Sequence, residues 1–365
     1  MKKAIKAISF SLVLSLVFGL FTWYSENYSF TERYAESNSK YRNIYDMPED
    51  TVDIIFFSTS IYRAILPSYL YLLNGNTSFN LFVDQMPVSL IKPILEHFLV
   101  EKQSPKLIVV DLSFAQRDPD IINQLHVRYT IEGLPFNIRY KILKDILPYY
   151  ENAPKIQSVD VFSYLFPALY EHNNYSNAVL GGKSYDSNTE INFMGNYKDL
   201  YWGAKKFASV PALNDYSPSP ISDNALEILD ELLDYAKTQE LELLFTMLPK
   251  TGIKGSGGKI DKTEMQQNKW LYDYVTNKGF TVLNLFADGY LDETGINPEK
   301  DFADERHLNM KGSAKFTYWL ATYLNENYEI KDHRDDDEYF DWLEMGFDFY
   351  EVCESHNLIL NLDLD

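Results

Sequence analysis

The sequence predicts an α/β fold, a three-layer α/β/α sandwich around a mainly parallel sheet of five strands. Several short apolar runs are uninterrupted, which is typical of central parallel strands covered on both faces. Segments with helical periodicity lie between these runs. Hydrophobic residues make up 45% of the 365 residues and charged residues 24%, so the chain can build a core and is not a disordered polymer.

The five expected strands are the apolar runs, most of them rich in aliphatic or aromatic residues. They lie at Val52–Phe57, Ser78–Val83, Leu107–Leu112, Leu241–Met247 and Phe280–Leu285. Because each run is short and bounded by polar or turn-forming residues, a strand is favoured over a buried helix.

The expected helices lie before or after these strands, as a series of βαβ units requires. Apolar residues recur with helical spacing over Pro87–Glu101, Asn224–Gln239, Lys262–Asn277 and Lys311–Asn327. Ser222 and Asp223 form a cap signal ahead of the second helix, and Gly279 ends the third.

Residues 115–220 break this alternation. The segment is rich in Tyr, Asn and Pro, with a helical piece at Asn137–Leu147 and a loop-like stretch at Ser187–Asp199. Such a length between consecutive strands exceeds what a crossover needs. We therefore expect a helical and irregular insertion over one end of the sheet, where it forms a lid or a substrate platform.

The first 24 residues carry a membrane-targeting signal. Lys2, Lys3 and Lys6 precede an uncharged apolar run at residues 7–24. This run is near the lower limit for crossing a bilayer and longer than the ~7–15-residue core of a signal peptide. No small-residue cleavage site follows, so we expect an uncleaved single-pass anchor, with secretion after cleavage as the alternative. The lysines keep the N-terminus inside, which puts the linker at 25–50 and the domain at 51–331 outside the cytoplasm.

The net charge of −20 is concentrated at the C-terminus. Residues 332–365 hold twelve acidic residues and one arginine, which leaves −9 for the rest of the chain. The negative charge disfavours nucleic acid or an anionic membrane surface as the main partner. Aromatic residues are interspersed with the acids of this tail. We expect either an amphipathic helix docked on the main domain or a solvated acidic tail.

Residue counts and spacing exclude several kinds of site. The single cysteine, Cys353, excludes an internal disulfide framework and a Cys-based zinc site. Gly252–Lys259 (GIKGSGGK) is not a phosphate loop, because Gly258 stands where the lysine is needed, and a flexible surface loop is expected instead. We expect no metal and no cofactor, since the remaining histidines lack the partner spacing of a metal site: His97, His126, His172, His333 and His356.

Three residues could perform nucleophilic chemistry at the carboxyl ends of the strands, where open α/β sheets bind ligands. Ser60 follows the first expected strand, and Asp304 and His307 precede the last expected helix. On a turn, Asp304 can accept a hydrogen bond from one imidazole nitrogen and leave the other as a base. We expect Ser60 as nucleophile, His307 as base and then acid, and Asp304 as the group that orients His307. The alternative for Asp304 and His307 is a loop hydrogen bond that caps the final helix.

The motifs around these residues resemble the SGNH (GDSL-like) hydrolase superfamily. Phe57–Ile61 (FSTSI) is similar to its strand-end serine motif. Asp304–Asn309 (DERHLN) and Gly312–Leu324 match its closing block, D-x-x-H-[LF]-N before a helix rich in Gly, Ala and aromatic residues. The resemblance covers about residues 52–327 without the insertion. It is closest to a membrane-anchored bacterial branch that includes the D-alanyl transfer protein of teichoic acid and alginate O-acetyltransferases.

The resemblance implies a serine acyl-ester hydrolase or O-acyltransferase. It implies an acyl group such as acetyl on a polysaccharide or cell-wall polymer, with a membrane acyltransferase complex as a further partner. The alternative is a catalytically impaired polysaccharide-binding or accessory protein in a glycan-modifying complex, with the Tyr-rich insertion contacting glycan.

The sequence departs from the family where the oxyanion hole would form. The family's glycine and histidine on either side of the nucleophile motif are Ser58 and Ile61 here. Its second-block glycine is not evident, and Asp111 and Ser113 stand in place of a G-x-N block. Our oxyanion candidates are the backbone N–H of Ser60 and the side chain of Asn80 or Gln85.

Overall fold

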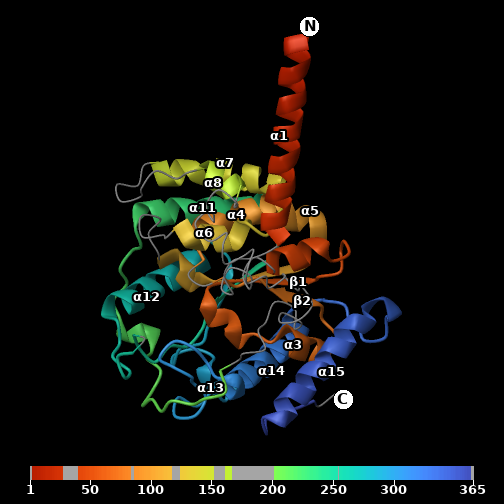
Figure 1. Ribbon diagram of the computed structural model, residues 1–365. Helices are drawn as coiled ribbons and strands as arrows, with labels where there is room; N and C mark the ends of the chain where they lie inside the picture. The colour runs from red at the N-terminus through yellow and green to blue at the C-terminus, as the bar shows by residue number, and fades with distance from the viewer. Residues whose placement is uncertain are drawn as a thin grey trace.

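The structure is a computed structural model (Figure 1). It describes residues 2–27, 40–83, 86–116, 124–151, 161–166, 201–253 and 255–362. Figure 1 shows a central sheet with helices on both sides of it, and a long helix, α1, that extends away from the rest.

The sheet has five strands, all parallel, in the order β2-β1-β3-β4-β5. The strands are β1 Ile54–Phe57, β2 Ser78–Asn80, β3 Leu107–Asp111, β4 Leu243–Met247 and β5 Thr281–Asn284. Each lies inside one of the five apolar runs. The α/β class and the parallel sheet of five strands are therefore confirmed. In a parallel sheet all carboxyl ends share one edge, so the loops after β1, β3 and β5 start along that edge.

Burial explains why the apolar runs predicted the strands well. Every residue of β1, β2, β3 and β4 is buried, and in β5 only Thr281 is exposed. A strand with both faces covered has no solvent-facing positions, so most of its residues are apolar and alternation with polar residues is lost.

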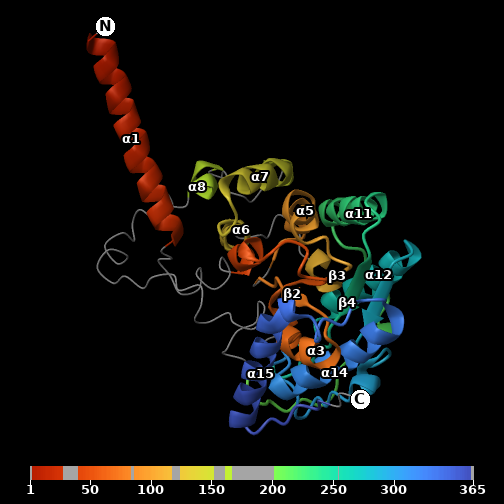
Figure 2. The ribbon, with the colours of Figure 1, turned by 90° about the vertical axis from the view of Figure 1, so that its right-hand side faces the viewer.

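Helices lie on each side of the sheet (Figure 2). On one side are α4 Ile91–Ile94, α5 Val100–Gln103 and α11 Asp223–Thr238, and on the other are α3 Pro67–Asn74, α14 Met310–Asn327 and α15 Phe340–Ser355. The helix α12 Lys262–Asn277 packs beside β5 and has the bounds that the sequence predicted. The predicted cap at Ser222 is also present, since its hydroxyl accepts the N–H of Ala225.

Two helical regions differ from the expectation. The helix predicted over Pro87–Glu101 is broken into a 3-10 turn, α4, a π-helical turn at Leu95–Leu99 and α5. Pro93 has no N–H to donate, so the regular hydrogen-bond ladder is incomplete there. The helix α3 was missed because all but one of its residues are buried, which removes the polar face that makes helical periodicity visible.

The described part of the insertion packs against helices. It contains α6 Gln124–Ile131, α7 Phe136–Glu151 and α8 Val161–Leu165, and α7 contacts α4 and the π-helical turn. This part therefore covers a helical face and not an end of the sheet. The loop expected at Ser187–Asp199 lies outside the described residues. Among the described residues of the insertion, those from Tyr201 onward reach the carboxyl edge, where Lys205 pairs with Phe302.

The acidic tail is docked on the domain. The helix α15 packs on α3, and Phe349 and Cys353 join a buried cluster with Leu66, Tyr69 and Met310. Gly346 makes this close approach possible, because a Cβ on it would lie 2.7 Å from a methyl carbon of Leu72. Of the two expectations for the tail, the docked amphipathic helix therefore describes residues 340–355.

The N-terminal helix α1 Lys2–Asn27 is the one described helix that is long and apolar enough to cross a membrane. Its apolar stretch, Lys2–Leu20, is not buried against the rest of the protein. Figures 1 and 2 show it leaving the domain on the side where α7 and α8 lie.

Candidate active site

Ser60 begins the 3-10 turn that follows β1. The turn η1 spans Ser60–Ala64, directly beyond the carboxyl end of the strand. Ser60 is partly exposed, whereas its neighbours Thr59 and Ile61 are buried. The hydroxyl of Ser60 therefore stands at the carboxyl edge of the sheet, where a ligand can reach it.

His307 and Asp304 meet Ser60 from the loop between β5 and α14. The Ser60 Oγ lies 3.0 Å from Nε2 of His307, and Nδ1 of His307 lies 2.9 Å from each carboxylate oxygen of Asp304. An ionised carboxylate only accepts hydrogen bonds, so Nδ1 carries the hydrogen and Nε2 of the neutral ring accepts from the Ser60 hydroxyl. The order carboxylate, imidazole, hydroxyl is the arrangement in which a base can take a proton from a nucleophile.

Asp304 is held ionised by its surroundings. Burial alone would raise the pKa of Asp304, but the hydrogen bond and the electrostatic attraction of the His307 ring act in the opposite direction. The backbone N–H groups of Arg306 and His307 also donate to Oδ1, at 2.8 and 2.9 Å. Together they hold the pKa of this carboxyl far below its usual range. Asp304 is therefore a fixed negative charge behind the imidazole.

The cap of the final helix is a different residue. Asn309 is the N-cap of α14, and its side-chain oxygen accepts the N–H of Gly312 at 3.1 Å. The Asn309 amide also donates to the carbonyl of Lys300 at 2.8 Å. The alternative interpretation, that Asp304 and His307 cap this helix, is therefore wrong, and their pairing needs another explanation.

The three oxyanion candidates have different outcomes. The Ser60 N–H is the first amide of its turn and has no partner within that turn. The Asn80 amide instead donates to the carbonyls of Tyr62 and Ile65, at 2.7 and 3.3 Å, so it braces the turn after the serine. Asn80 also accepts the N–H of Phe82 at 3.3 Å. Gln85 lies outside the described residues.

Asp111 connects two neighbouring strand ends at this edge. Its carboxylate accepts the hydroxyl of Ser58 at 2.9 Å, the hydroxyl of Ser113 at 2.6 Å and the N–H of Ser113 at 3.0 Å. All three residues are buried. Because a buried carboxylate needs hydrogen bonds in place of water, these contacts tie the end of β3 to the loop that carries Ser60.

A cavity of about 220 Å³ lies beside the serine. Thr59 and Ile61 line it from either side of Ser60, and Arg306 lines it next to His307. Its other lining residues are mostly polar and include Ser113, Gln116, Lys250, Asp261, Thr263, Glu264 and Gln267. The cavity is thus positioned to receive part of a molecule that reacts at Ser60.

An ion network forms one wall of this cavity. Glu264 bridges Lys250 and Arg306, with nitrogen–oxygen distances of 2.7 Å to each. Arg306 belongs to the DERHLN motif, so the network anchors the loop that carries Asp304 and His307 to α12. Spacing gave no signal for this contact, because Glu264 and Arg306 are brought together only by the fold.

The glycine-rich loop is tied to the same motif. The Glu305 carboxylate accepts the N–H groups of Gly255 at 2.9 Å and Gly257 at 2.8 Å. The Gly255 N–H is the first of several backbone donors that lower the pKa of Glu305. The backbone amides of this loop therefore bind the carboxylate of Glu305 and not a phosphate. The loop, which we expected to be a flexible surface loop, is anchored beside the candidate site.

Tyr201 and Arg63 complete the surroundings of the imidazole. The ring centroids of Tyr201 and His307 are 5.5 Å apart, and the guanidinium of Arg63 lies 5.5 Å from the Tyr201 ring. Arg63 Nη1 also lies 3.5 Å from the Tyr201 hydroxyl. No local pattern singles out Tyr201, which is one of many tyrosines in the insertion.

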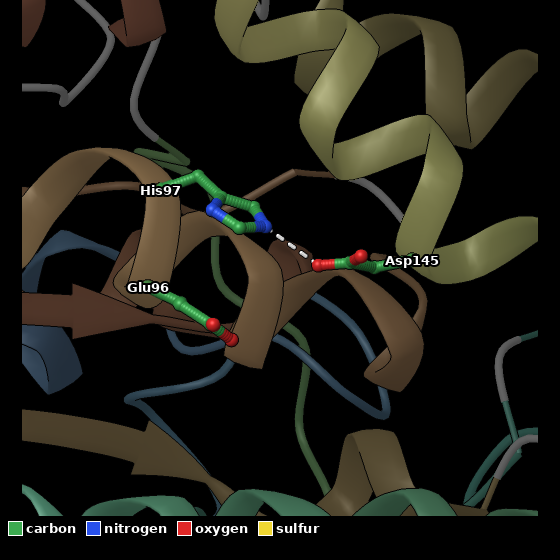
Figure 3. A group of neighbouring side chains, drawn as sticks. All are labelled: Glu96, His97 and Asp145. Atoms are coloured by element: carbon green, nitrogen blue, oxygen red, sulfur yellow. Dashed lines mark hydrogen bonds and ion pairs between the residues drawn. The ribbon is translucent and has the colours of Figure 1, made fainter.

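One further group of side chains brings together atoms of the kind that bind metal ions. One carboxylate oxygen each of Glu96 and Asp145 and a ring nitrogen of His97 lie within 4.8 Å of one another, in the π-helical turn and α7 (Figure 3). Nε2 of His97 lies 2.6 Å from Asp145, and Figure 3 shows Glu96 set apart from that pair. Spacing gave His97 no partner, but the fold does. The contact joins α7 to the helix beneath it.

Comparisons with known proteins leave the family open. No protein-family model and no curated protein match the chain. Among solved structures, the chain is similar to a gut microbial diltiazem-metabolizing enzyme, with 9% identity and a TM-score of 0.24. That match covers 77% of this chain and 48% of the other, so the chain spans about half the length of that enzyme.

Proposed function

We propose that this protein is a membrane-tethered serine acyl-ester hydrolase or O-acyltransferase that acts outside the cytoplasm. The observation that carries the proposal is the hydrogen-bonded series Ser60, His307 and Asp304, with 3.0 Å between Ser60 Oγ and His307 Nε2. Its substrate is an acylated polysaccharide or cell-wall polymer, and a membrane acyltransferase complex is a further partner.

The chemistry follows from the direction of the hydrogen bonds. His307 Nε2 takes the hydroxyl proton of Ser60 while Ser60 Oγ forms a bond to the ester carbonyl carbon. The imidazolium then gives this proton to the departing alcohol oxygen, which leaves an acyl group on Ser60. Water or a sugar hydroxyl, deprotonated by His307, attacks this acyl-enzyme in turn and releases Ser60. Asp304 stabilises the imidazolium through Nδ1 and remains ionised throughout.

The cavity supports a small acyl group. Its volume of about 220 Å³ is below the ~300–1,000 Å³ of ordinary small-molecule sites. The hydroxyl and amide groups of Thr59, Ser113 and Gln116 are unsuited to a long alkyl chain. An acetyl group with part of a sugar ring suits both the size and the polarity of this space.

The fold class and the N-terminal helix support the remaining parts of the proposal. A parallel sheet in the order β2-β1-β3-β4-β5, with helices on each side, is what an SGNH-like three-layer sandwich requires. The exposed apolar helix α1 suits a single-pass anchor, because an unburied apolar helix of this length is stable in lipid and not in water.

One observation favours a second function, a glycan-binding accessory protein with little catalysis. The Asn80 amide is engaged by backbone carbonyls, and Gln116 donates to Glu264 and Asn268 at 2.8 and 2.7 Å. Neither amide is therefore available to stabilise an oxyanion. Loss of one such donor typically lowers kcat by about 10²–10³-fold.

Labelling with a fluorophosphonate probe tests the nucleophile. The probe should modify the wild type and not Ser60→Ala. The matched control is Ser58→Ala, which should still be labelled because its hydroxyl donates to Asp111 and not to His307. Equal labelling of the wild type and Ser60→Ala would disprove the assignment. Labelling of Ser60 without turnover of any acetyl ester would favour the accessory function.

A further inference from the structure

We propose that the outer face of α7, together with Phe162 of α8, is a membrane-contact surface that lies on the headgroups of the bilayer crossed by α1. The proposal rests on the membrane anchoring proposed above and is independent of the chemistry at Ser60. It concerns the part of the insertion that does not reach the active site.

The first observation is a stripe of exposed aromatic side chains. Phe136 and Tyr140 lie one helical turn apart on α7 and are 47% and 53% exposed, and Phe162 on α8 is 67% exposed. The opposite face of α7, with Ile138, Ile142 and others, is buried against α4 and the π-helical turn. A stripe of large apolar rings turned away from the core is a common mark of an interaction surface.

The second observation places this stripe at the end of the membrane helix. The ring of Phe18 on α1 lies 5.3 Å from Phe166, and Phe166 lies 5.5 Å from Phe136. Phe18 is six residues before the end of the uncharged run at residues 7–24, which corresponds to about 9 Å along a helix. The start of α7 therefore lies near the outer end of the span, within the depth of about 5–10 Å at which interfacial helices sit.

The orientation of α7 agrees with this depth. Figures 1 and 2 both show α7 and α8 on the side of the domain from which α1 leaves, with α7 running crosswise to α1. A helix crosswise to a membrane-spanning helix lies along the membrane plane. Its buried face is turned to the domain, so the exposed rings are turned to the bilayer.

The composition of the stripe favours lipid over a protein partner. Lys141 and Lys144 are exposed on the same helix as Phe136 and Tyr140. Aromatic rings with flanking lysines are typical of helices that lie at the lipid interface, where the rings enter the acyl boundary and the ammonium groups meet lipid phosphates. The net negative charge of the protein does not oppose this contact, because more than half of it belongs to residues 332–365, and α15 lies on the far side of the domain.

Depth-dependent quenching in the full-length protein tests the proposal. Tyr140→Cys and Phe162→Cys carry an environment-sensitive fluorophore in vesicles of phosphatidylglycerol and phosphatidylcholine, with or without spin-labelled lipid. Phe347→Cys is the matched control, since Phe347 is also 53% exposed but lies on α15. The unsubstituted chain, in which Cys353 is buried, gives the labelling background.

The expected result is quenching at positions 140 and 162 at least about twofold stronger than at 347, because interfacial helices sink about 5–10 Å into the headgroup region. Equal quenching at all three positions overturns the proposal. So does a blue shift at 140 that grows with protein concentration without lipid quenching, since a second copy then covers the stripe. A label at Phe10→Cys separates the anchor proposal from the proposed membrane contact of α7. This label is quenched by spin-labelled lipid if α1 spans the bilayer, and absence of quenching at position 10 disproves the anchor itself.

Discussion

The hydroxyl of Ser60 lies 3.0 Å from Nε2 of His307, although 247 positions separate the two residues in the chain. The contact forms because β1 and β5 both end at the carboxyl edge of one parallel sheet, and the two residues lie in the segments that follow these strands. Neither residue is the N-cap of the helix beside it, since Thr59 precedes the turn after β1 and Asn309 caps α14.

Asp304→Asn should lower kcat for acetyl esters by about 10⁴-fold with little change in KM, because an asparagine no longer selects the Nδ1–H tautomer or stabilises the imidazolium. Steady-state kinetics with an acetyl ester measure both constants. Asp301→Asn is not a suitable control, because Asp301 forms an ion pair with Lys315. Asp292→Asn is the suitable control, because Asp292 is exposed on the short helix α13, Leu291–Thr294. A variant Asp304→Asn with full activity would mean that Asp304 neither orients His307 nor stabilises its imidazolium.

The same carboxyl should make stability depend on pH in one direction. Its pKa is lowered in the folded protein, so its stabilising contribution is complete above the unfolded pKa of about 3.9 and is lost as pH falls toward the folded value. The difference in unfolding free energy between the wild type and Asp304→Asn should therefore shrink as pH falls below about 4. Denaturant titrations check this, and a difference that grows below about pH 4 would contradict it.

The strands and the long amphipathic helices were readable from sequence for a simple reason. Strands buried on both faces are continuous apolar runs, and α12 has a polar face and the capping residue Asp261 at its start. The buried helix α3 has neither signal, so it was missed. Sequence patterns therefore predicted the apolar strands and the capped amphipathic helices, but not a helix that is buried on all sides.

In the candidate site, too, contacts between residues close in sequence could be predicted, and contacts between distant residues could not. Asp304 and His307 are three positions apart, so their contact is local and could be expected. The contacts of Tyr201 with His307 and of Glu264 with Arg306 join distant parts of the chain and have no local signature. The position of Asn80 made it a reasonable oxyanion donor. Its amide instead donates to the backbone carbonyls of Tyr62 and Ile65, and these contacts depend on the folded backbone.

Glu305→Gln should loosen the glycine-rich loop beside the site. A neutral amide accepts the N–H groups of Gly255 and Gly257 more weakly than a carboxylate, and we expect a loss of about 1–3 kcal/mol in unfolding free energy. Thermal or denaturant unfolding measures this, and limited proteolysis should show faster cleavage within the loop. The control Glu299→Gln removes an exposed ion pair with Lys206 and should change stability by less than about 0.5 kcal/mol. Equal effects would mean that Glu305 does not hold the loop.

Gly346→Val should undock the acidic tail. Its side chain would collide with Leu72 of α3, and overpacking of this kind typically costs about 1–3 kcal/mol. Cys353 reports the change, because burial in the same interface raises the pKa of its thiol to about 12 and keeps it unreactive. A thiol reagent should therefore modify Gly346→Val faster than the wild type. Asp348→Val, exposed on the same helix, should leave the rate unchanged, and equal rates for all three proteins would mean that α15 is not held at Gly346.

The polarity of the cavity beside Ser60 predicts a preference for short acyl groups. Every lining residue except Ile61 is polar or charged, so a long alkyl chain would displace water from these groups without gaining apolar contacts. Each ~1.4 kcal/mol of such penalty lowers kcat/KM about tenfold, and we expect at least this loss from acetyl to octanoyl nitrophenyl esters. Ile61→Ala, which removes the apolar side chain from this lining, should deepen the loss, and Ser60→Ala gives the background rate. Faster cleavage of the octanoyl ester by the wild type would mean that the acyl group lies elsewhere.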